Sequence, residues 1–136
     1  MRIVCDTNVL VSAVVYGGRP REVLETLITG RTRGFLSPAL AQEFREVLRR
    51  PKFGLAEAQV DQICTALRDL LQLVYPQEEA LVIKEDPNDN AVLACALEAG
   101  ADCIVTGDHH LLDLGRYRTI EIVGPSELLD RLGRSA

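Results

Sequence analysis

Short apolar runs alternate along the chain with segments of helical periodicity. Runs of this length, rich in Val, Ile, Leu and Phe, are typical of strands buried on both faces of a parallel sheet. A further strand is expected to begin in the segment Val74–Pro76 and to extend toward Ile83 after an irregular stretch. The other predicted strands are Arg2–Cys5, Gly34–Ser37, Cys103–Thr106 and Thr119–Val123.

Capping residues, glycines and prolines mark the ends of the segments with helical periodicity. The predicted helices run from about Asn8 to the Gly17–Gly18 break, from Arg19–Pro20 to Gly30, from the Ser37 cap to Arg50, over Ala56–Leu73, from Asp86–Pro87 to Gly100, and briefly after Pro125. This alternation of strands and helices predicts an α/β fold with a central parallel sheet covered by helices, in one domain over residues 1–136.

Composition narrows the class of protein. The longest apolar stretch, Val9–Tyr16, is interrupted by Ser12 and is much shorter than the roughly 20 residues of a membrane-spanning helix. The four cysteines lack the spacing of a zinc site, and we expect them to be reduced residues of the core. We therefore expect a soluble, cytoplasmic protein with no secretory signal and no membrane partner.

Two carboxylates directly follow apolar runs. Asp6 comes after the first predicted strand, and Asp108 comes after Cys103–Gly107. Side chains at the carboxyl ends of parallel strands gather at one edge of the sheet, where α/β proteins place their functional groups. Taken singly, Asp6 is also explained as a helix cap and Asp108 as a turn residue.

Two further acids are candidates for the same edge. Asp89 lies in the first turn of a predicted helix that leads into the Asp108 strand, where Asp86 is well placed as the cap. Glu43 lies at the edge of the apolar stripe of its helix, which also suits a boundary residue. Four converging carboxylates repel one another unless a cation binds them, and all-oxygen ligation suits Mg²⁺ or Mn²⁺. One or two such ions serve phosphoryl transfer.

These residues resemble the motifs of a known family. Asp6-Thr-Asn-Val-Leu, Glu43 in a Ser-Pro-x-Leu-x-x-Glu setting, Asp86-Pro-Asn-Asp89 and Val105-Thr-Gly-Asp108 occur in the order and spacing of PIN-domain ribonucleases. The chain looks most like their VapC-like group, the toxin component of bacterial toxin–antitoxin pairs. The resemblance runs from Met1 to about Leu132.

The resemblance implies a three-layer α/β/α sandwich and a metal-dependent endoribonuclease that hydrolyses phosphodiester bonds of RNA. It also implies a small antitoxin partner and a homodimer. The residues that match the family's metal-binding and catalytic acids are Asp6, Glu43, Asp89 and Asp108. Asn8 and Thr106 match its supporting polar positions.

This sequence departs from the family pattern in two places. His109 and His110 follow Asp108 where the family often has a further acid, and Asn88 stands where Asp is frequent. His110 or Asp113 is a candidate substitute for the missing acid, although hard cations prefer oxygen to imidazole, and the histidines also suit a surface loop.

Net charge is −5, but residues 1–52 carry 9 Lys and Arg against 5 Asp and Glu, whereas residues 53–136 carry 6 against 15. A basic surface beside an acidic site suits RNA. Arg19, Arg21 and Tyr16 are the predicted RNA contacts. A second basic group at one helix end also suits a solvated helix face, and its members are Arg45, Arg49, Arg50 and Lys52.

Two classes of function remain open at this point. One is the metal-dependent ribonuclease, and the other is a catalytically weak scaffold that binds protein or RNA partners. Other α/β phosphoryl-transfer enzymes fit poorly. Receiver domains need a lysine near the last strand, whereas the lysines here are Lys52 and Lys84. Dehalogenase-like phosphatases need Asp-x-Asp after the first strand, whereas Asn8 holds that position.

Overall fold

A computed structural model of the chain describes residues 1–78 and 87–134. Its elements, in chain order, are β1 (Arg2–Cys5), α1 (Thr7–Val15), α2 (Gly18–Ile28), β2 (Arg33–Leu36), α3 (Pro38–Leu48), a 3-10 helix (Pro51–Phe53), α4 (Glu57–Leu70), β3 (Gln72–Leu73), α5 (Pro87–Ala99), β4 (Cys103–Val105), α6 (His109–Leu114), β5 (Arg116–Tyr117), β6 (Ile120–Val123) and α7 (Pro125–Arg134).

Within the described ranges the strands form one sheet of order β3-β2-β1-β4-β6-β5. All neighbours are parallel except β5, which pairs antiparallel with β6. Chain order reverses at β1, because the chain moves outward through β2 and β3 and then returns to β4 on the other side of β1. This switch point lies between the carboxyl ends of β1 and β4, where open α/β sheets place their functional sites.

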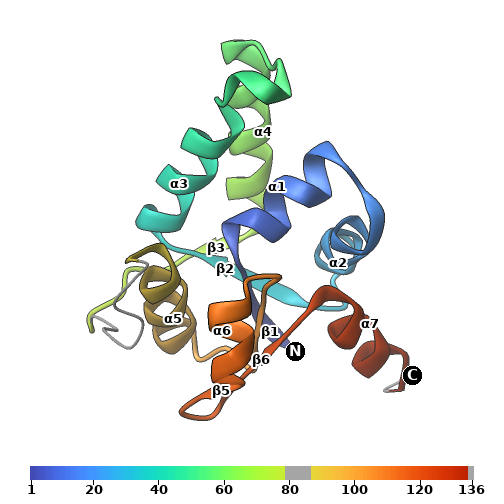
Figure 1. The fold of residues 1–136 in the computed structure, drawn as a ribbon, viewed down its shortest axis with the longest axis vertical. Coiled ribbons are helices and arrows are strands. Elements are labelled where there is room, and N and C mark those ends of the chain that lie inside the picture. The colour runs from blue at the N-terminus through green and yellow to red at the C-terminus, as the bar shows by residue number, and fades with distance from the viewer. Residues whose placement is uncertain (79–86, 135–136) are drawn as a thin grey trace.

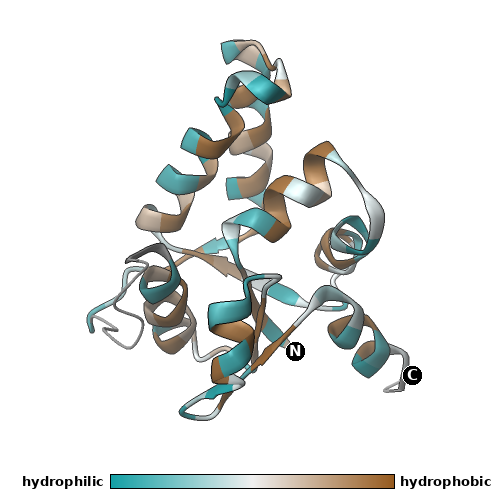
Figure 2. Ribbon diagram, in the orientation of Figure 1, coloured by the Kyte–Doolittle hydropathy of each residue, from teal (hydrophilic) through white to brown (hydrophobic). Residues whose placement is uncertain are grey.

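Helices cover the sheet in layers. On one face α5 packs against β1, β2 and β4, and on the other α2 packs against α7 (Figure 1). The predicted three-layer α/β/α sandwich is thus confirmed. In Figure 2 the inner strands are largely brown, whereas α2 and α3 are teal along one side, which is the pattern of helices that cover a core.

The sheet and the α2 layer approach most closely at Gly34 in β2. A Cβ atom at this position would lie 2.7 Å from Leu27 Cδ2 of α2, and it would also collide with Leu71. Real Cβ atoms essentially never approach so closely. A residue with a Cβ at this position would therefore force the side chains of Leu27 and Leu71 to shift.

Most predicted elements are confirmed, with local corrections. Helix α4 ends at Leu70, not at Leu73 as predicted, and Gln72 and Leu73 pair with Phe35 and Leu36 to form β3. The third strand thus ends just before the predicted Val74–Pro76 segment begins. The backbone amide of Val74 still donates to Leu36 O at 2.8 Å. Its expected extension to Ile83, and Asp86, lie outside the described residues. The sequence patterns predicted neither α6 nor β5.

Candidate metal centre

Three acids from distant parts of the chain meet at the switch point. Asp6, Asp89 and Asp108 each offer a carboxylate oxygen, and these three oxygens lie within 4.8 Å of one another. Asp6 is 4% exposed and Asp89 is 3% exposed, whereas Asp108 is half-buried. The cluster therefore has a buried floor and one acid at its opening.

Two of the acids are fixed by the ends of adjacent strands. β1 and β4 pair in register, Cys5 opposite Val105, and the backbone amide of Asp6 donates to Val105 O at 2.9 Å. Each acid also caps the helix that follows it. Asp6 Oδ1 accepts from the Asn8 amide at 3.3 Å, and Asp108 Oδ1 accepts from the His110 amide at 2.8 Å. The caps hold both carboxylates at the sheet edge.

Thr106 connects these two acids. Its hydroxyl donates to Asp6 Oδ2 at 2.8 Å and accepts from the backbone amide of Asp108 at 3.0 Å. Thr106 is fully buried, and its own amide donates to Val123 O at 2.9 Å. The side chain predicted as a supporting residue therefore lies between two of the acids.

The remaining predicted site residues lie around this cluster. Glu43, on α3, is half-buried and is not in the three-acid group. Asn8 is exposed at the start of α1, and its backbone amide, not its side chain, contacts Asp6. Among the described residues, His110 contributes no ring nitrogen to the acidic group. Its proposed role as a substitute metal ligand stays a prediction.

The chemistry of this donor set fits a hard divalent cation. All three groups offer carboxylate oxygen, which Mg²⁺ and Mn²⁺ prefer to nitrogen or sulfur. The neighbouring Cys5 does not alter that preference, because burial, reinforced by the charge of Asp6, raises the pKa of its thiol to about 12. Among the described residues, the sulfur of Cys5 is not part of the group that could hold an ion.

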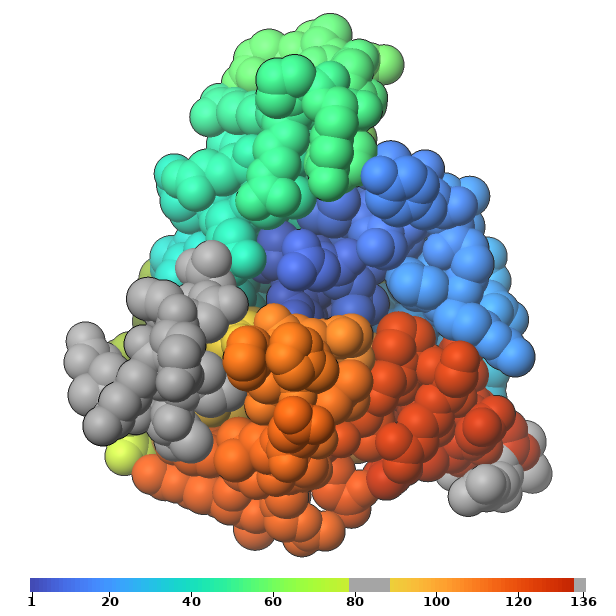
Figure 3. Space-filling view, viewed as in Figure 1, coloured from blue at the N-terminus to red at the C-terminus, as the bar shows by residue number. Residues whose placement is uncertain are grey.

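An open groove of about 390 Å³ lies beside the cluster. We call it the α1–α6 groove, and its lining residues are Asn8, Val9, Ser12, Pro20, Gly107, Asp108, His109, His110 and Pro125. Figure 3 shows the surrounding surface, where the start of α1 (dark blue) borders α6 (orange) and the start of α7 (red). Asp108 belongs to both the groove and the acidic cluster, so the two are continuous.

The predicted RNA contacts do not line this groove. Arg21 Nε donates to Ala13 O at 2.9 Å, so its guanidinium group caps the end of α1. Arg19 forms an exposed ion pair with Glu22 at 3.3 Å. Tyr16 is 71% exposed and its ring meets Phe53 edge-on. Their assignment to RNA stays a prediction.

Three residues that line the groove were not predicted from the sequence, namely Ser12, Pro20 and Pro125. They come from three separate helices, α1, α2 and α7, so no local pattern connects them.

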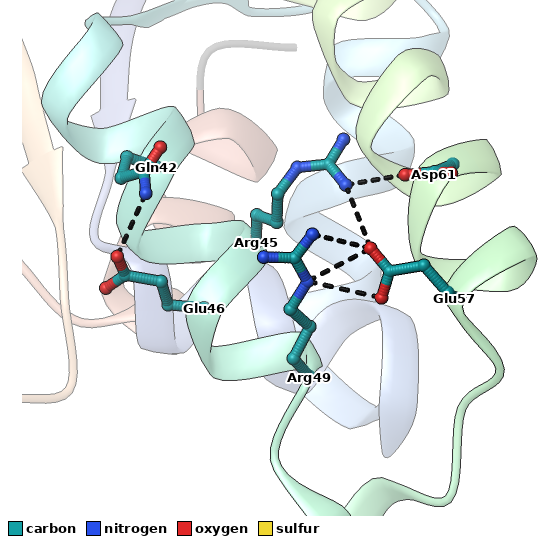
Figure 4. Close-up of polar contacts among 6 residues, drawn as sticks. All are labelled: Gln42, Arg45, Glu46, Arg49, Glu57 and Asp61. Carbon is teal, nitrogen blue, oxygen red and sulfur yellow. Dashed lines mark hydrogen bonds and ion pairs between the residues drawn. The ribbon is translucent and has the colours of Figure 1, made fainter.

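The second basic group is engaged in ion pairs between α3 and α4 (Figure 4). Arg45 Nη1 lies 2.6 Å from Asp61 Oδ1 and 3.8 Å from Glu57 Oε1. Arg49 Nη2 lies 2.5 Å from Glu57 Oε1. The hydrogen bonds that Arg45 donates to Asp61 and Arg49 donates to Glu57 raise the pKa of both guanidinium groups above its ordinary value. The acids of α4 thus pair with Arg45 and Arg49 of this group.

The fold and the site together define a class of protein. It is an α/β protein with a candidate metal centre at the switch point of its largely parallel sheet. The model of the PIN domain family matches residues 2–110, and the chain belongs to this family. The family resemblance read from the motifs is thereby confirmed.

Among solved structures, the chain is similar to a chain in the crystal structure of VapBC2 from Rickettsia felis bound to a DNA fragment from their promoter. The TM-score is 0.66 at 15% sequence identity, with 91% of this chain and 98% of that chain covered. At this identity the likeness shows a shared fold. No curated protein matches the chain in sequence. None of the helices in the described residues is long and apolar enough to cross a membrane.

Proposed function

We propose that this chain is a metal-dependent endoribonuclease that acts as the toxin of a toxin–antitoxin pair. The observation that carries the proposal is the meeting of Asp6, Asp89 and Asp108 within 4.8 Å at the edge of a PIN-domain sheet. Three carboxylates so close together, two of them buried, are stable together when a cation balances their charge. In this proposal the acids that would hold Mg²⁺ or Mn²⁺ are Asp6, Glu43, Asp89 and Asp108. The supporting residues are Asn8, Thr106, Asp86 and His110.

The protein side chains divide the work of the reaction. When bound, the divalent ion would neutralise charge on the scissile phosphate and lower the pKa of an attacking water. The Thr106 hydroxyl and the Asn8 amide both donate to Asp6, so this carboxylate is oriented before substrate binds. Asp108, half-buried at the opening, is the acid that a phosphodiester approaching from solvent would meet first.

The proposed protein partners are suggested by the same family membership. The similar VapBC2 structure supports a small antitoxin as the partner of this chain, and we expect a homodimer. Such a nuclease acts in the cytoplasm, where its four free cysteines stay reduced.

The test combines cleavage with metal binding. Purified protein is incubated with total RNA in Mn²⁺, Mg²⁺ or EDTA, and Mn²⁺ binding is measured by calorimetry. We expect cleavage in either metal, none in EDTA, and loss of both cleavage and saturable binding in Asp89→Asn. Asp130→Asn, which removes an exposed acid of α7, is the matched control and should behave as wild type.

Two results would contradict the proposal. Cleavage that persists in Asp89→Asn would show that the acidic cluster is not the catalytic centre. Absence of both metal binding and cleavage in a folded wild-type protein would favour the alternative, a catalytically weak PIN scaffold that binds protein or RNA partners.

A further inference from the structure

The α1–α6 groove carries a feature that the acidic cluster does not need. The rings of His109 and His110, at the start of α6, lie with centroids 4.3 Å apart and planes tilted by 34°. Both residues are exposed, and both line the groove. Neither ring belongs to the three-acid group. The two rings contact each other, so a ligand in the groove could stack only on an outer face of the pair.

The rest of the lining is mixed in a way that suits a flat heteroaromatic ligand. Pro20 and Pro125 supply apolar surface, while Asn8 and Ser12 supply an amide and a hydroxyl able to pair with ring edges. A volume of about 390 Å³ lies within the range of small-molecule sites, roughly 300–1,000 Å³. The groove has room for one nucleoside.

The charges within the groove point to the orientation of that ligand. Among the described residues, no Lys or Arg lines it and Asp108 is its one acid, so those residues would not hold an anionic group in the groove. Asp108 also belongs to the acidic cluster, where a metal would attract phosphate. A nucleotide that spans both regions would place its phosphate at the acids and its base in the groove.

We propose that the α1–α6 groove is a base-binding subsite, in which His109 and His110 stack on an unpaired RNA base next to the scissile phosphate. The proposal rests on the proposed ribonuclease function. Unpaired bases are commonly held on aromatic side chains, including histidine, whereas bases in a duplex are already stacked. The subsite therefore selects single-stranded RNA.

The test measures stacking directly and without cleavage. The nucleoside 2-aminopurine riboside, which has no phosphate for the metal-free acids to repel, is titrated with protein in EDTA, and fluorescence quenching and anisotropy are recorded. The variants are His109→Ala/His110→Ala, which removes both rings, and His109→Phe/His110→Phe, which keeps aromatic faces. The hydrogen bond from the His110 backbone amide to Asp108 remains possible in both variants. Leu112→Ala, an exposed position of α6 outside the groove, is the matched control.

We expect the alanine variant to lose the quenching and to bind about tenfold more weakly, which is within the range measured for loss of base stacking. The phenylalanine variant should keep the quenching, and Leu112→Ala should match wild type. In cleavage assays with Mn²⁺, KM should rise in the alanine variant and stay close to the wild-type value in the phenylalanine variant.

Quenching and affinity that are unchanged in the alanine variant would overturn the subsite and leave the groove available to a protein segment. Loss of quenching in the phenylalanine variant would equally overturn stacking as its basis. Because binding is measured without a catalytic metal, these outcomes are distinguishable from failure of the proposed function. A protein that cleaves RNA normally with both rings removed is a nuclease without this subsite.

Discussion

The hydroxyl of Thr106 donates to Asp6 Oδ2 at 2.8 Å, across the junction between the ends of β4 and β1. These residues are 100 positions apart in sequence, and both are buried. The same hydroxyl accepts from the Asp108 amide, so one side chain sets the positions of two acids. The geometry of the acidic cluster thus depends on a residue that carries no charge.

Replacing Thr106 by valine keeps the shape of the side chain and removes its hydroxyl. We expect the free energy of unfolding to fall by about 1–3 kcal/mol, because Asp6 loses a buried donor and the Asp108 amide loses an acceptor. Mn²⁺ affinity should also fall. Urea unfolding and calorimetry measure the two effects. Thr106→Ser, which retains the hydroxyl, should restore most of both, and a serine variant as impaired as valine would contradict the hydrogen-bond explanation.

Metal binding should appear as a gain in stability that depends on the acids. A ligand present at 100 times its Kd stabilises the folded state by about 2.7 kcal/mol, so saturating Mn²⁺ should raise the Tm of the wild-type protein. In Asp108→Asn this increase should be small, while the metal-free protein loses little stability because Asn also caps helices well. Scanning calorimetry with and without Mn²⁺ checks this expectation. An equal increase in Tm in both proteins would place the ion elsewhere.

Gly34→Ala should destabilise the fold by about 1–3 kcal/mol, because the added methyl group collides with Leu27 and Leu71 and forces the α2 layer away from the sheet. The control is Gly133→Ala in α7, where no atom lies within 4 Å of the added Cβ. That control should stabilise the protein by up to about 1 kcal/mol, since alanine favours helix. Denaturant unfolding compares the two variants. A neutral Gly34→Ala would mean that the two layers can separate at little cost.

Stability should fall at alkaline pH because of buried thiols. Burial raises the pKa of Cys95 to about 12, despite a hydrogen bond with Ser37 that lowers it. Above pH 9 the unfolded thiol loses its proton while the folded thiol keeps it. The unfolded state then binds fewer protons, so the free energy of unfolding decreases with pH.

The expected decrease is at most about 1.4 kcal/mol per pH unit for each such thiol, between about pH 9 and 12. The stabilising contribution is complete below pH 9. Urea unfolding at several pH values measures the slope in wild type and in Cys95→Ala. The variant should be less stable at pH 7, because a small cavity forms, but its stability should decline less steeply above pH 9. Identical slopes would rule out this origin.

The ion-paired arginines of α3 should contribute little to RNA binding. The guanidinium group of Arg49 is already paired with Glu57. Replacing Arg49 should therefore remove no contact with an RNA phosphate. For single-stranded nucleic acid, each phosphate contact adds about 0.7 to the slope of log affinity against log salt. We expect Arg49→Gln to leave that slope unchanged in anisotropy titrations with an RNA oligonucleotide. A slope smaller by about 0.7 would instead assign Arg49 to the RNA interface.

Helix ends illustrate what local sequence can predict. Ser37 followed by Pro38 predicts the start of α3, and in the structure the Ser37 hydroxyl accepts from the Leu40 amide. The end of α4 illustrates the opposite case. Leu71, Gln72 and Leu73 continue the helical pattern, but pairing of β3 with β2 outweighs this local preference. The sequence of neither strand alone shows that the two strands pair, since the paired residues are more than 30 positions apart.

The sequence by itself determined the alternation of strands and helices, the family motifs and the placement of Asp6 and Asp108 at strand ends, because these depend on local periodicity and capping. The tertiary structure decided that Asp89 joins those two acids and that Thr106 connects Asp6 to Asp108. It also decided that α1, α2, α6 and α7 together form a groove with two histidine rings. The physical reason is that these relationships arise only when distant segments pack against one sheet, and packing of that kind has no local signature.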